Sequence, residues 1–364
     1  MAIPPDPAAR KGRGATSNPD NRFFRSHSVA EPDGWALAPD PLPPLATTVT
    51  PLANRSILSR NDSPDIPFSL SINPYQGCEH GCIYCYARPS HAYLDLSPGL
   101  DFETRLFAKT NAAELLRREL ASSRHAVSCI NIGANTDPYQ PIERDYRITR
   151  SLLEVMLETR HPVALVTKNA LVLRDLDLLG ELARLNLVRV YISVTTLDAG
   201  LAQVLEPRAS APHRRLQAIA RLREAGVPVG TLVAPLIPFV NDDELEAILA
   251  EVAGAGAEWA GYVMLRLPHE VKDLFRDWLE AHLPLRAARV MAAMQQMRGG
   301  RDNDPRFGAR MTGQGTLALL LRRRFEVAAS RLGLNREQAP LRCDLFQPPP
   351  RPARGPAEPQ LDLF

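Results

Sequence analysis

The feature that most restricts the fold of this chain is a regular alternation of strand and helix patterns between about residues 69 and 270. Short β-branched runs alternate there with segments of helical periodicity, which predicts parallel strands joined by right-handed helical crossovers. Six such units are fewer than the eight that close a TIM barrel. The expected strands are 69–73, 127–132, 163–167, 188–195, 228–234 and 261–266, and the expected helices between them are 112–121, 146–159, 173–185, 212–225 and 242–254.

Three of the five cysteines directly follow the first expected strand, in the order C-x3-C-x2-C. They are Cys78, Cys82 and Cys85, and glycines at 77 and 81 allow the backbone to wrap closely around a small inorganic core. Thiolates on one short loop can hold three corners of a cubane iron–sulfur cluster, whose full ligation takes four cysteines. The sequence therefore predicts a cluster with one iron open to a small molecule.

Two other uses of these cysteines were weighed. Zinc favours paired C-x2-C knuckles with four ligands. Only one such pair is present, and His80 would have to serve as the fourth ligand from between the first two cysteines. A disulfide framework is disfavoured by the odd number of cysteines and by the lack of a secretory signal.

With Tyr84 before the last cysteine, the loop resembles the radical S-adenosylmethionine (SAM) superfamily signature, C-x3-C-x-aromatic-C. The resemblance implies a [4Fe–4S] cluster whose unique iron chelates the amino and carboxylate groups of SAM. One-electron reduction, from a donor of flavodoxin or ferredoxin type, then releases a 5′-deoxyadenosyl radical. It also implies an open (βα)6 partial barrel. The finer match, residues 73–78 running into 85–87, resembles the branch that contains spore photoproduct lyase.

Ligands of parallel sheets bind at the carboxyl ends of the strands, so residues there are the candidate cofactor contacts. By resemblance to spore photoproduct lyase, Thr136 and Asp137 contact SAM and the Lys168 ammonium meets its carboxylate. An Asx-type turn built by Asn135 and Asp137 is the alternative for that segment. Alternation puts Ser193 and Thr195 on one face of the fourth strand, where either hydroxyl could reach the cofactor.

Further contacts are expected from an arginine that could clamp a carboxylate bidentately and from a small residue that would allow close approach of the adenine. Aromatic residues of the cysteine loop are expected to flank the cofactor. The complete expected set is Tyr84, Tyr86, Thr136, Asp137, Lys168, Ser193, Arg208 and Ala234.

One departure from the resembled branch limits what can be carried over. In spore photoproduct lyase a cysteine hydrogen-atom donor stands at the start of the motif after the second strand, and Ala134 occupies that position here. Repair of the spore photoproduct itself is therefore not expected. The candidates for a hydrogen or radical relay are Tyr86 and, if the tail folds back, Cys343, whereas Cys129 is expected to lie in the core.

The composition divides the chain into four expected parts: a proline-rich extension (1–67), the partial barrel (68–270), a basic helical extension (271–339) and a proline-rich tail (340–364). Both ends are expected to be extended or loosely packed. Residues 11–19 are basic and glycine-rich, and are either a solvated tail or an arm over the active site. The expected helices of the extension are 271–281, 284–298 and 315–332.

The distribution of charge along the chain indicates which kind of partner the protein could bind. The net charge of the whole chain is only +2. From 286 to 336, however, eleven arginines face three acidic residues. Such a local surplus attracts phosphate backbones, although a solvated helical face is an equal alternative. No run of 18 apolar residues and no signal peptide is present, which predicts a cytoplasmic protein without a membrane span.

The last five residues, Gln360–Phe364, resemble the short peptide by which bacterial DNA polymerases and repair proteins dock on the replication sliding clamp. The leading interpretation is thus a radical SAM enzyme that acts on damaged or modified DNA. The alternatives are a clamp-tethered nucleic-acid-binding protein with a structural or redox-sensing cluster, and radical modification of RNA or protein.

Overall fold

The computed structural model describes residues 12–24, 45–337 and 339–350, and its centre is one curved sheet. Six parallel strands run in the order β10-β9-β8-β7-β6-β3, and β2 joins the β3 edge in antiparallel orientation. This is the expected partial barrel. The strands are β2 (Ser59–Arg60), β3 (Leu70–Ile72), β6 (Ile130–Ile132), β7 (Val163–Thr167), β8 (Val188–Ser193), β9 (Val229–Leu236) and β10 (Trp259–Met264).

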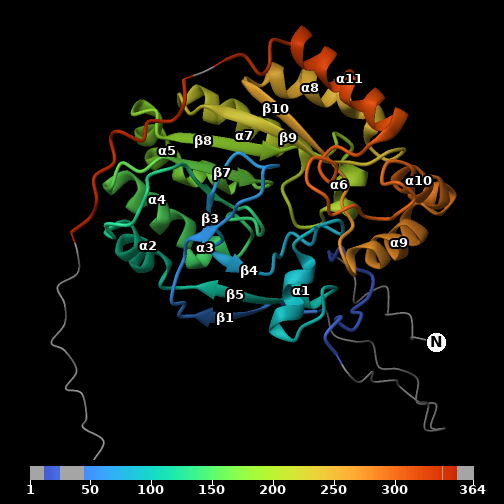
Figure 1. The fold of residues 1–364 in the computed structure, drawn as a ribbon, viewed down its shortest axis with the longest axis horizontal. Helices are drawn as coiled ribbons and strands as arrows, with labels where there is room; N and C mark the ends of the chain where they lie inside the picture. Colours follow the sequence, from blue (N-terminus) through green and yellow to red (C-terminus); the bar gives the residue numbers. More distant parts are fainter. Residues whose placement is uncertain (1–11, 25–44, 338, 351–364) are drawn as a thin grey trace, which may run out of the picture.

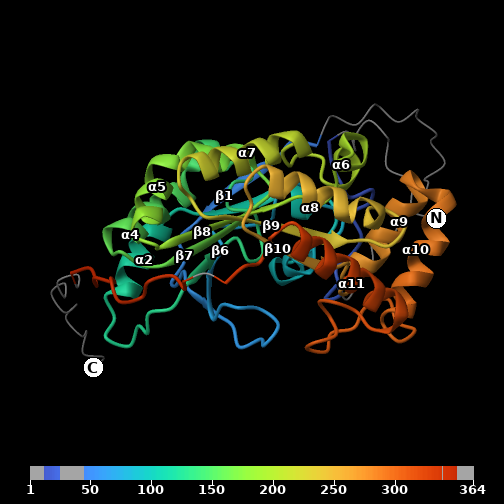
Figure 2. The ribbon, with the colours of Figure 1, turned by 90° about the horizontal axis from the view of Figure 1, so that it is seen from above.

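The helices that connect the strands cover one face of the sheet (Figure 2). Each buries an apolar stripe toward the strands, as Leu179 and Leu182 do in α5. Local signals set their ends: α7 begins at Pro212 and is followed by Gly226 with φ +74°. The covering helices are α2 (Ala112–Leu120), α4 (Ile148–Glu158), α5 (Leu176–Arg184), α7 (Pro212–Glu224) and α8 (Leu245–Gly254).

A second, smaller sheet was not expected from the sequence. Strand β5 (Arg105–Lys109) pairs with β1 (Thr48–Leu52) in parallel and with β4 (Tyr75–Gln76) in antiparallel orientation. Because β4 immediately precedes the cysteine loop, this sheet holds the loop from outside the barrel. The 3-10 helix η2 (Arg88–Leu94) and α1 (Asp101–Thr104) complete this support.

The described part of the amino-terminal extension packs more closely than its composition predicts. Ala15 is 1% exposed and belongs to the hydrophobic core. Both carboxylate oxygens of Glu103 accept backbone hydrogen bonds, from Gly14 at 3.0 Å and from Ala15 at 2.8 Å. Residues 12–24 are therefore an arm over the cysteine loop rather than a solvated tail.

The chain after the sixth strand forms the three expected helices, α9 (Val271–His282), α10 (Pro284–Gln296) and α11 (Gly315–Arg331). They lie at one end of the molecule, and the segment 339–350 returns to the opposite end (Figure 1). The backbone amide of Gln347 donates to Thr159, and the Phe346 ring packs against both His125 and His161. Among the described residues, no helix has the length and apolar character needed to cross a membrane.

Candidate functional site

The three expected ligands lie together on the loop after β4, at the carboxyl end of the sheet. Gly77 and Gly81 have φ +76° and +68°, and a Cβ atom on Gly77 would lie 2.7 Å from a Leu106 methyl group. Burial raises the pKa of Cys78, Cys82 and Cys85, and neighbouring thiolates raise that of Cys78 and Cys82 further. Thiol groups of this kind become thiolates when a metal centre supplies positive charge.

An ion pair inside the protein fixes the conformation of this loop. The guanidinium of Arg88 is fully buried and pairs with Glu103. It also donates to the carbonyl oxygen of Cys82 at 2.9 Å and to that of Gly81 at 3.1 Å. Because Glu103 also binds the amino-terminal arm, one carboxylate joins the arm to the cysteine loop.

A buried carboxylate, Glu206, organises the strand ends that face the loop. It pairs with Arg215, and its Oε1 lies 3.3 Å from Nζ of Lys168 and accepts from the Thr195 hydroxyl at 2.6 Å. The hydroxyl of Tyr84 also donates to Glu206. Burial alone would raise the pKa of Glu206, but Arg215 and Lys168 lower it well below its usual value. Glu206 is thus a fixed negative charge beside the cysteines.

Lys168 has the position expected of it. Its Nζ donates to the carbonyl oxygen of Ala234 at 3.0 Å and to Thr195 at 3.2 Å, and lies 5.7 Å from the centre of the Tyr84 ring. The Lys168 side chain remains 15% exposed. The ammonium group therefore joins the ends of β7, β8 and β9 at a point open to a ligand.

The motif after β6 serves the protein's own structure. Asp137 accepts from the Thr167 hydroxyl at 2.6 Å and from the Lys168 amide at 2.7 Å, and its Oδ2 lies 3.4 Å from His80 Nδ1. Burial would raise the pKa of Asp137, but His80 and these hydrogen bonds lower it overall. Thr136 donates to the Tyr75 carbonyl oxygen at 2.9 Å.

The contacts of Asp137 also include the amide of Tyr139 at 2.9 Å, which is the Asx-type turn weighed as an alternative. A direct contact of the Asp137 carboxylate or the Thr136 hydroxyl with SAM stays a prediction. Both groups already have protein partners, so we assign them the positioning of neighbouring strand ends.

The other expected cofactor contacts differ in how close they lie to the Lys168 network. Of the two hydroxyls at the end of β8, that of Thr195, two residues beyond the strand, joins the Lys168 network, whereas Ser193 offers its carbonyl oxygen to Arg215 at 3.1 Å. Arg208 is already paired: its guanidinium binds Glu79 and donates to the Gly12 carbonyl oxygen at 3.2 Å. The carboxylate that Arg208 binds here belongs to the protein, and its contact with the cofactor stays a prediction.

Tyr86 lies at the mouth of the site and is 44% exposed. Its hydroxyl donates to the carbonyl oxygen of Ala134, and its ring lies 5.3 Å from the guanidinium carbon of Arg266. Tyr86 thereby connects the cysteine loop to the ends of β6 and β10.

The relay role considered for Cys343 is contradicted by its position. Cys343 lies in the segment 339–350, where Arg342 donates through its amide to the carbonyl oxygen of Asn186, just before β8. This is the amino end of the sheet, opposite the cysteine loop. Cys129 immediately precedes β6 at the same end, where burial raises the pKa of its thiol to about 12 and the nearby Cys343 adds to the rise. The tail folds back, but onto the wrong end for Cys343 to reach the site.

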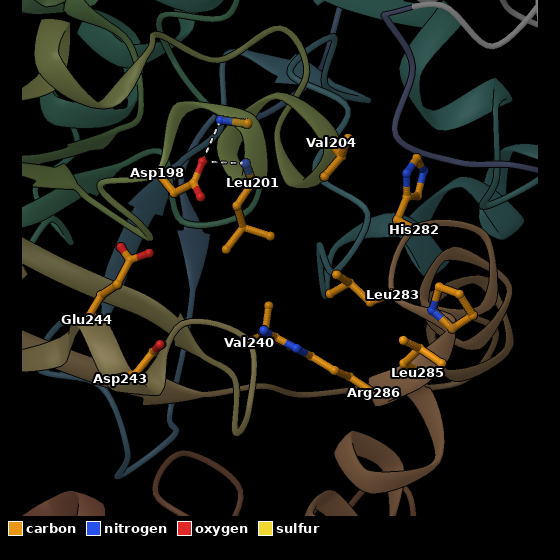
Figure 3. Close-up of a pocket in the computed structure, with 12 residues that line it drawn as sticks. Asp198, Leu201, Val204, Val240, Asp243, Glu244, His282, Leu283, Leu285 and Arg286 are labelled. Carbon is orange, nitrogen blue, oxygen red and sulfur yellow. Dashed lines mark hydrogen bonds between the residues drawn. The ribbon is translucent and has the colours of Figure 1, made fainter.

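A cavity of about 610 Å³ lies beyond the strand ends, between α6 (Ala199–Leu205), the turn after β9 and α10. Figure 3 shows Asp243 and Glu244 on one side and Arg286 with Leu285 on the other. The loop cysteines and Lys168 do not line it. The carboxylate of Asp198 accepts from two amides of α6 and so has a structural partner. This cavity is separate from the candidate site.

The geometry of the cysteine loop also bears on whether its residues could form a zinc site. His80 would be the fourth ligand, but both of its ring nitrogens already have protein partners: Nδ1 faces Asp137 and Nε2 lies 3.1 Å from the side-chain nitrogen of Asn169. Within the described ranges, no three His, Cys, Asp or Glu side chains are arranged to hold a single metal ion. Cysteines that each bind a different iron of a cluster lie farther apart than the ligands of one ion.

Comparison with known families decides which centre the loop holds. The Radical SAM superfamily matches residues 72–252, which include the cysteine loop and the strand ends described above. The chain belongs to the radical SAM superfamily. The cofactors of this superfamily are a [4Fe–4S] cluster and SAM. The radical SAM loop of this chain fits them, since two buried thiols and one partly buried thiol converge beside the partly exposed ammonium of Lys168.

Two relatives show how far sequences similar to the radical SAM region of this chain diverge. An uncharacterised protein of Mycobacterium tuberculosis is 36% identical over 59% of this chain and 64% of its own length. An uncharacterised protein of Methanocaldococcus jannaschii is 28% identical over 48% of this chain and 62% of its own length. The chain thus spans less than two thirds of each relative.

Among solved structures, the fold is similar to that of spore photoproduct lyase. The complex of that enzyme with a dinucleoside spore photoproduct has a TM-score of 0.57 and 15% identity, and covers 79% of this chain and 80% of the lyase. A variant with bound AdoMet and the same dinucleoside has a TM-score of 0.56 and 16% identity over the same shares. These similarities show the same fold.

Several residues of the radical SAM site were missed or undervalued from the sequence. Glu206 stands next to the Pro207–Arg208 pair, and the arginine was preferred as the functional group. A glutamate directly after the apolar helix Ala199–Leu205 was the available signal for a buried charge. Glu103 and Arg88 gave no local signal, because their pairing depends on the second sheet.

Proposed function

We propose that this protein is a radical SAM enzyme whose substrate is nucleic acid, in the first place damaged or modified DNA. The observation that supports the chemistry is the convergence of Cys78, Cys82 and Cys85 with Lys168 at the carboxyl end of a partial barrel. Bound there, the cluster and SAM supply reductive cleavage of a C–S bond and a 5′-deoxyadenosyl radical that removes hydrogen from the substrate.

The chain's own residues bind and orient the cofactors. Cys78, Cys82 and Cys85 would hold three irons, and the Lys168 ammonium would hold the carboxylate of SAM. Glu206 keeps Lys168 in place through their 3.3 Å contact. The amino-terminal arm excludes water from the outer side of the loop, where Gly14 and Gly81 are in van der Waals contact.

The substrate class rests on the fold. A spore photoproduct lyase of the same fold holds a dinucleoside. The arginine surplus between residues 286 and 336 is a second support, because phosphate backbones bind such segments. RNA and protein are the alternative substrates. If one of them is the true substrate, added DNA would have no effect on the reaction.

We assign the hydrogen relay to Tyr86. Within the part of the chain that the structure describes, the cysteines other than the loop ligands lie at the amino end of the sheet, and Ala134 offers only a carbonyl oxygen to Tyr86. The exposed phenol is therefore the hydrogen donor nearest the loop mouth. The change of Tyr86 to Phe should retain cofactor cleavage and abolish product release from DNA, whereas equal product yield would exclude this role.

The experiment that tests the enzyme class is anaerobic reconstitution followed by reduction. We expect about four irons and four sulfides per chain. Dithionite with SAM should release 5′-deoxyadenosine, and lesion-containing DNA should increase its yield. Replacing Cys82 by Ser should abolish the release, while Cys129→Ser serves as the matched control. A protein that takes up zinc and no cluster would refute the proposal.

The remaining partners stay proposals. Gln360–Phe364 lies outside the described residues, and we propose that it docks on the sliding clamp; deletion of these five residues with unchanged clamp affinity would exclude this. A flavodoxin or ferredoxin in a reducing cytoplasm would supply the electron. We also propose that the chain divides at residues 67 and 339. Residues 45–67 and 339–350 nevertheless pack on the barrel.

A further inference from the structure

A half-buried arginine, Arg266, follows the last parallel strand and lies beside the radical SAM loop. Its guanidinium carbon is 5.3 Å from the centre of the Tyr86 ring, and Tyr86 directly follows Cys85. Since the Tyr86 hydroxyl binds the end of β6, the same tyrosine joins the two sides of the curved sheet. Arg266 therefore lies at the mouth of the site, although β10 is the edge strand.

Arg266 differs from the other buried arginines near the site. Arg88 and Arg215 each form an ion pair with a buried carboxylate. Arg266 has no carboxylate at ion-pair distance among residues 12–24, 45–337 and 339–350; its Nη1 lies 3.8 Å from the Met311 sulfur. Its buried Nε atom has no hydrogen-bond partner there. A desolvated guanidinium with free donors is unfavourable unless an anion binds it.

The surroundings of Arg266 add positive charge. Arg298 is buried, and its two terminal nitrogens donate to backbone carbonyl oxygens at 2.7 and 2.9 Å, with no carboxylate among these partners. Arg310 pairs with Asp65. Burial and the nearby Arg310 lower the pKa of Arg266 against the opposite effect of Tyr86 and Asp65. Burial and Arg266 lower the pKa of Arg298 to about 10 against the effect of Asp304. Such a site favours a ligand with more than one negative charge or several acceptor oxygens.

We propose that Arg266 binds a phosphate group of the substrate at the mouth of the radical SAM site, next to Tyr86. This inference rests on the proposed function and names the group by which the substrate is held. The planar fork of arginine matches the oxygens of a phosphate, and its stacking on an aromatic ring fixes its direction. The phosphate belongs either to a nucleic-acid backbone or to a free phosphorylated molecule such as a nucleotide.

The test compares two single replacements in the reconstituted full-length protein. Arg266→Met removes the charge and keeps the apolar stem. The control, Arg221→Gln, removes an exposed arginine that pairs with the exposed Glu224 and lies outside the basic segment. The probes are a fluorescent single-stranded DNA oligonucleotide, whose Kd is measured by anisotropy at several salt concentrations, and inorganic phosphate, whose effect is measured as a shift in Tm.

We expect Arg266→Met to weaken oligonucleotide binding about tenfold or more, as for a lost charge-assisted hydrogen bond. The slope of log K against log salt should fall in magnitude by about 0.7, the value for one phosphate contact on a single strand. The phosphate-dependent rise in Tm should disappear in this variant. Arg221→Gln should change the Kd and the Tm shift by less than about twofold, since its pair is exposed.

Equal behaviour of the two variants with both probes would overturn the phosphate site. A second outcome is that the native protein binds no oligonucleotide but shows a phosphate-dependent rise in Tm that Arg266→Met loses. This outcome would support the phosphate site and assign it to a free phosphorylated molecule. It would also refute the nucleic-acid function. Iron content and cooperative unfolding check the fold of each variant. If Arg266→Met does not fold, Arg266→Gln carries the same test with the same outcomes.

Discussion

Replacing Glu206 by Gln tests the electrostatic design of the site. Glu206 and Arg215 are each 2% exposed and form a direct ion pair. Lys168 is the second cation on the same carboxylate, at 3.3 Å. The neutral amide of glutamine would leave a buried guanidinium without a counter-charge, while the volume and most of the packing stay the same.

The size of the effect follows from this burial. Removing one partner of a buried ion pair costs about 3–5 kcal/mol, because the remaining charge is desolvated and unpaired. The matched control is Glu181→Gln. Glu181 pairs with Arg184, and their side chains are 57% and 73% exposed. An exposed pair of this kind contributes less than about 1 kcal/mol.

The assay is urea unfolding of the cluster-free protein under anaerobic conditions. The pKa of Glu206 is lowered in the folded state, so its stabilisation is fully present above the unfolded pKa and is lost as the pH falls toward the folded value. Between about pH 6 and 8 the difference between Glu206→Gln and the native protein should thus be constant. If Glu206→Gln and Glu181→Gln agree within about 1 kcal/mol, the network is not the source of stability described here.

Three further predictions concern the arm and the tail. Gly14→Ala should displace the arm, because the new Cβ would lie 1.8 Å from the Gly81 carbonyl oxygen. We expect the free energy of unfolding to fall by about 1–3 kcal/mol and the cluster absorbance to bleach faster in air, whereas Gly254→Ala should change neither. Cys343→Ser should leave 5′-deoxyadenosine formation unchanged, and a loss of turnover with retained iron would contradict its placement at the amino end. Phe346→Ala should cost about 1–2 kcal/mol in urea unfolding, since its half-buried ring packs on two histidines; equal midpoints would show that the tail does not dock there.

The main sheet could be predicted because each of its strands has a local pattern. In β7, Val163, Leu165 and Thr167 are buried, and the two residues between them are only partly buried. The second sheet has no such pattern. Strand β4 is two residues long, and β1 pairs with β5 across a separation that spans the cysteine loop, as in Thr48 opposite Arg105. Pairing over such a distance is decided by tertiary packing.

The candidate site divides in the same way. Cysteine spacing and the lysine after β7 are local signals, and both residue types lie where the sequence predicts. The partner of a charged group is not a local property. Arg208 was expected to bind a cofactor carboxylate but binds Glu79, and Glu206 took the central position beside Lys168. Only the fold determines which carboxylate meets which cation.

The amino-terminal arm binds residues that lie far from it in the sequence. Gly14 binds Glu103, and Ser17 donates to Asp277 across 260 positions. Contacts of such long range depend on the fold of the chain between them. The cover that the arm places over Gly81 therefore depends on the structure of the barrel behind it. A rigid fusion that holds residues 12–24 away from the loop would leave the radical SAM loop accessible in the folded chain.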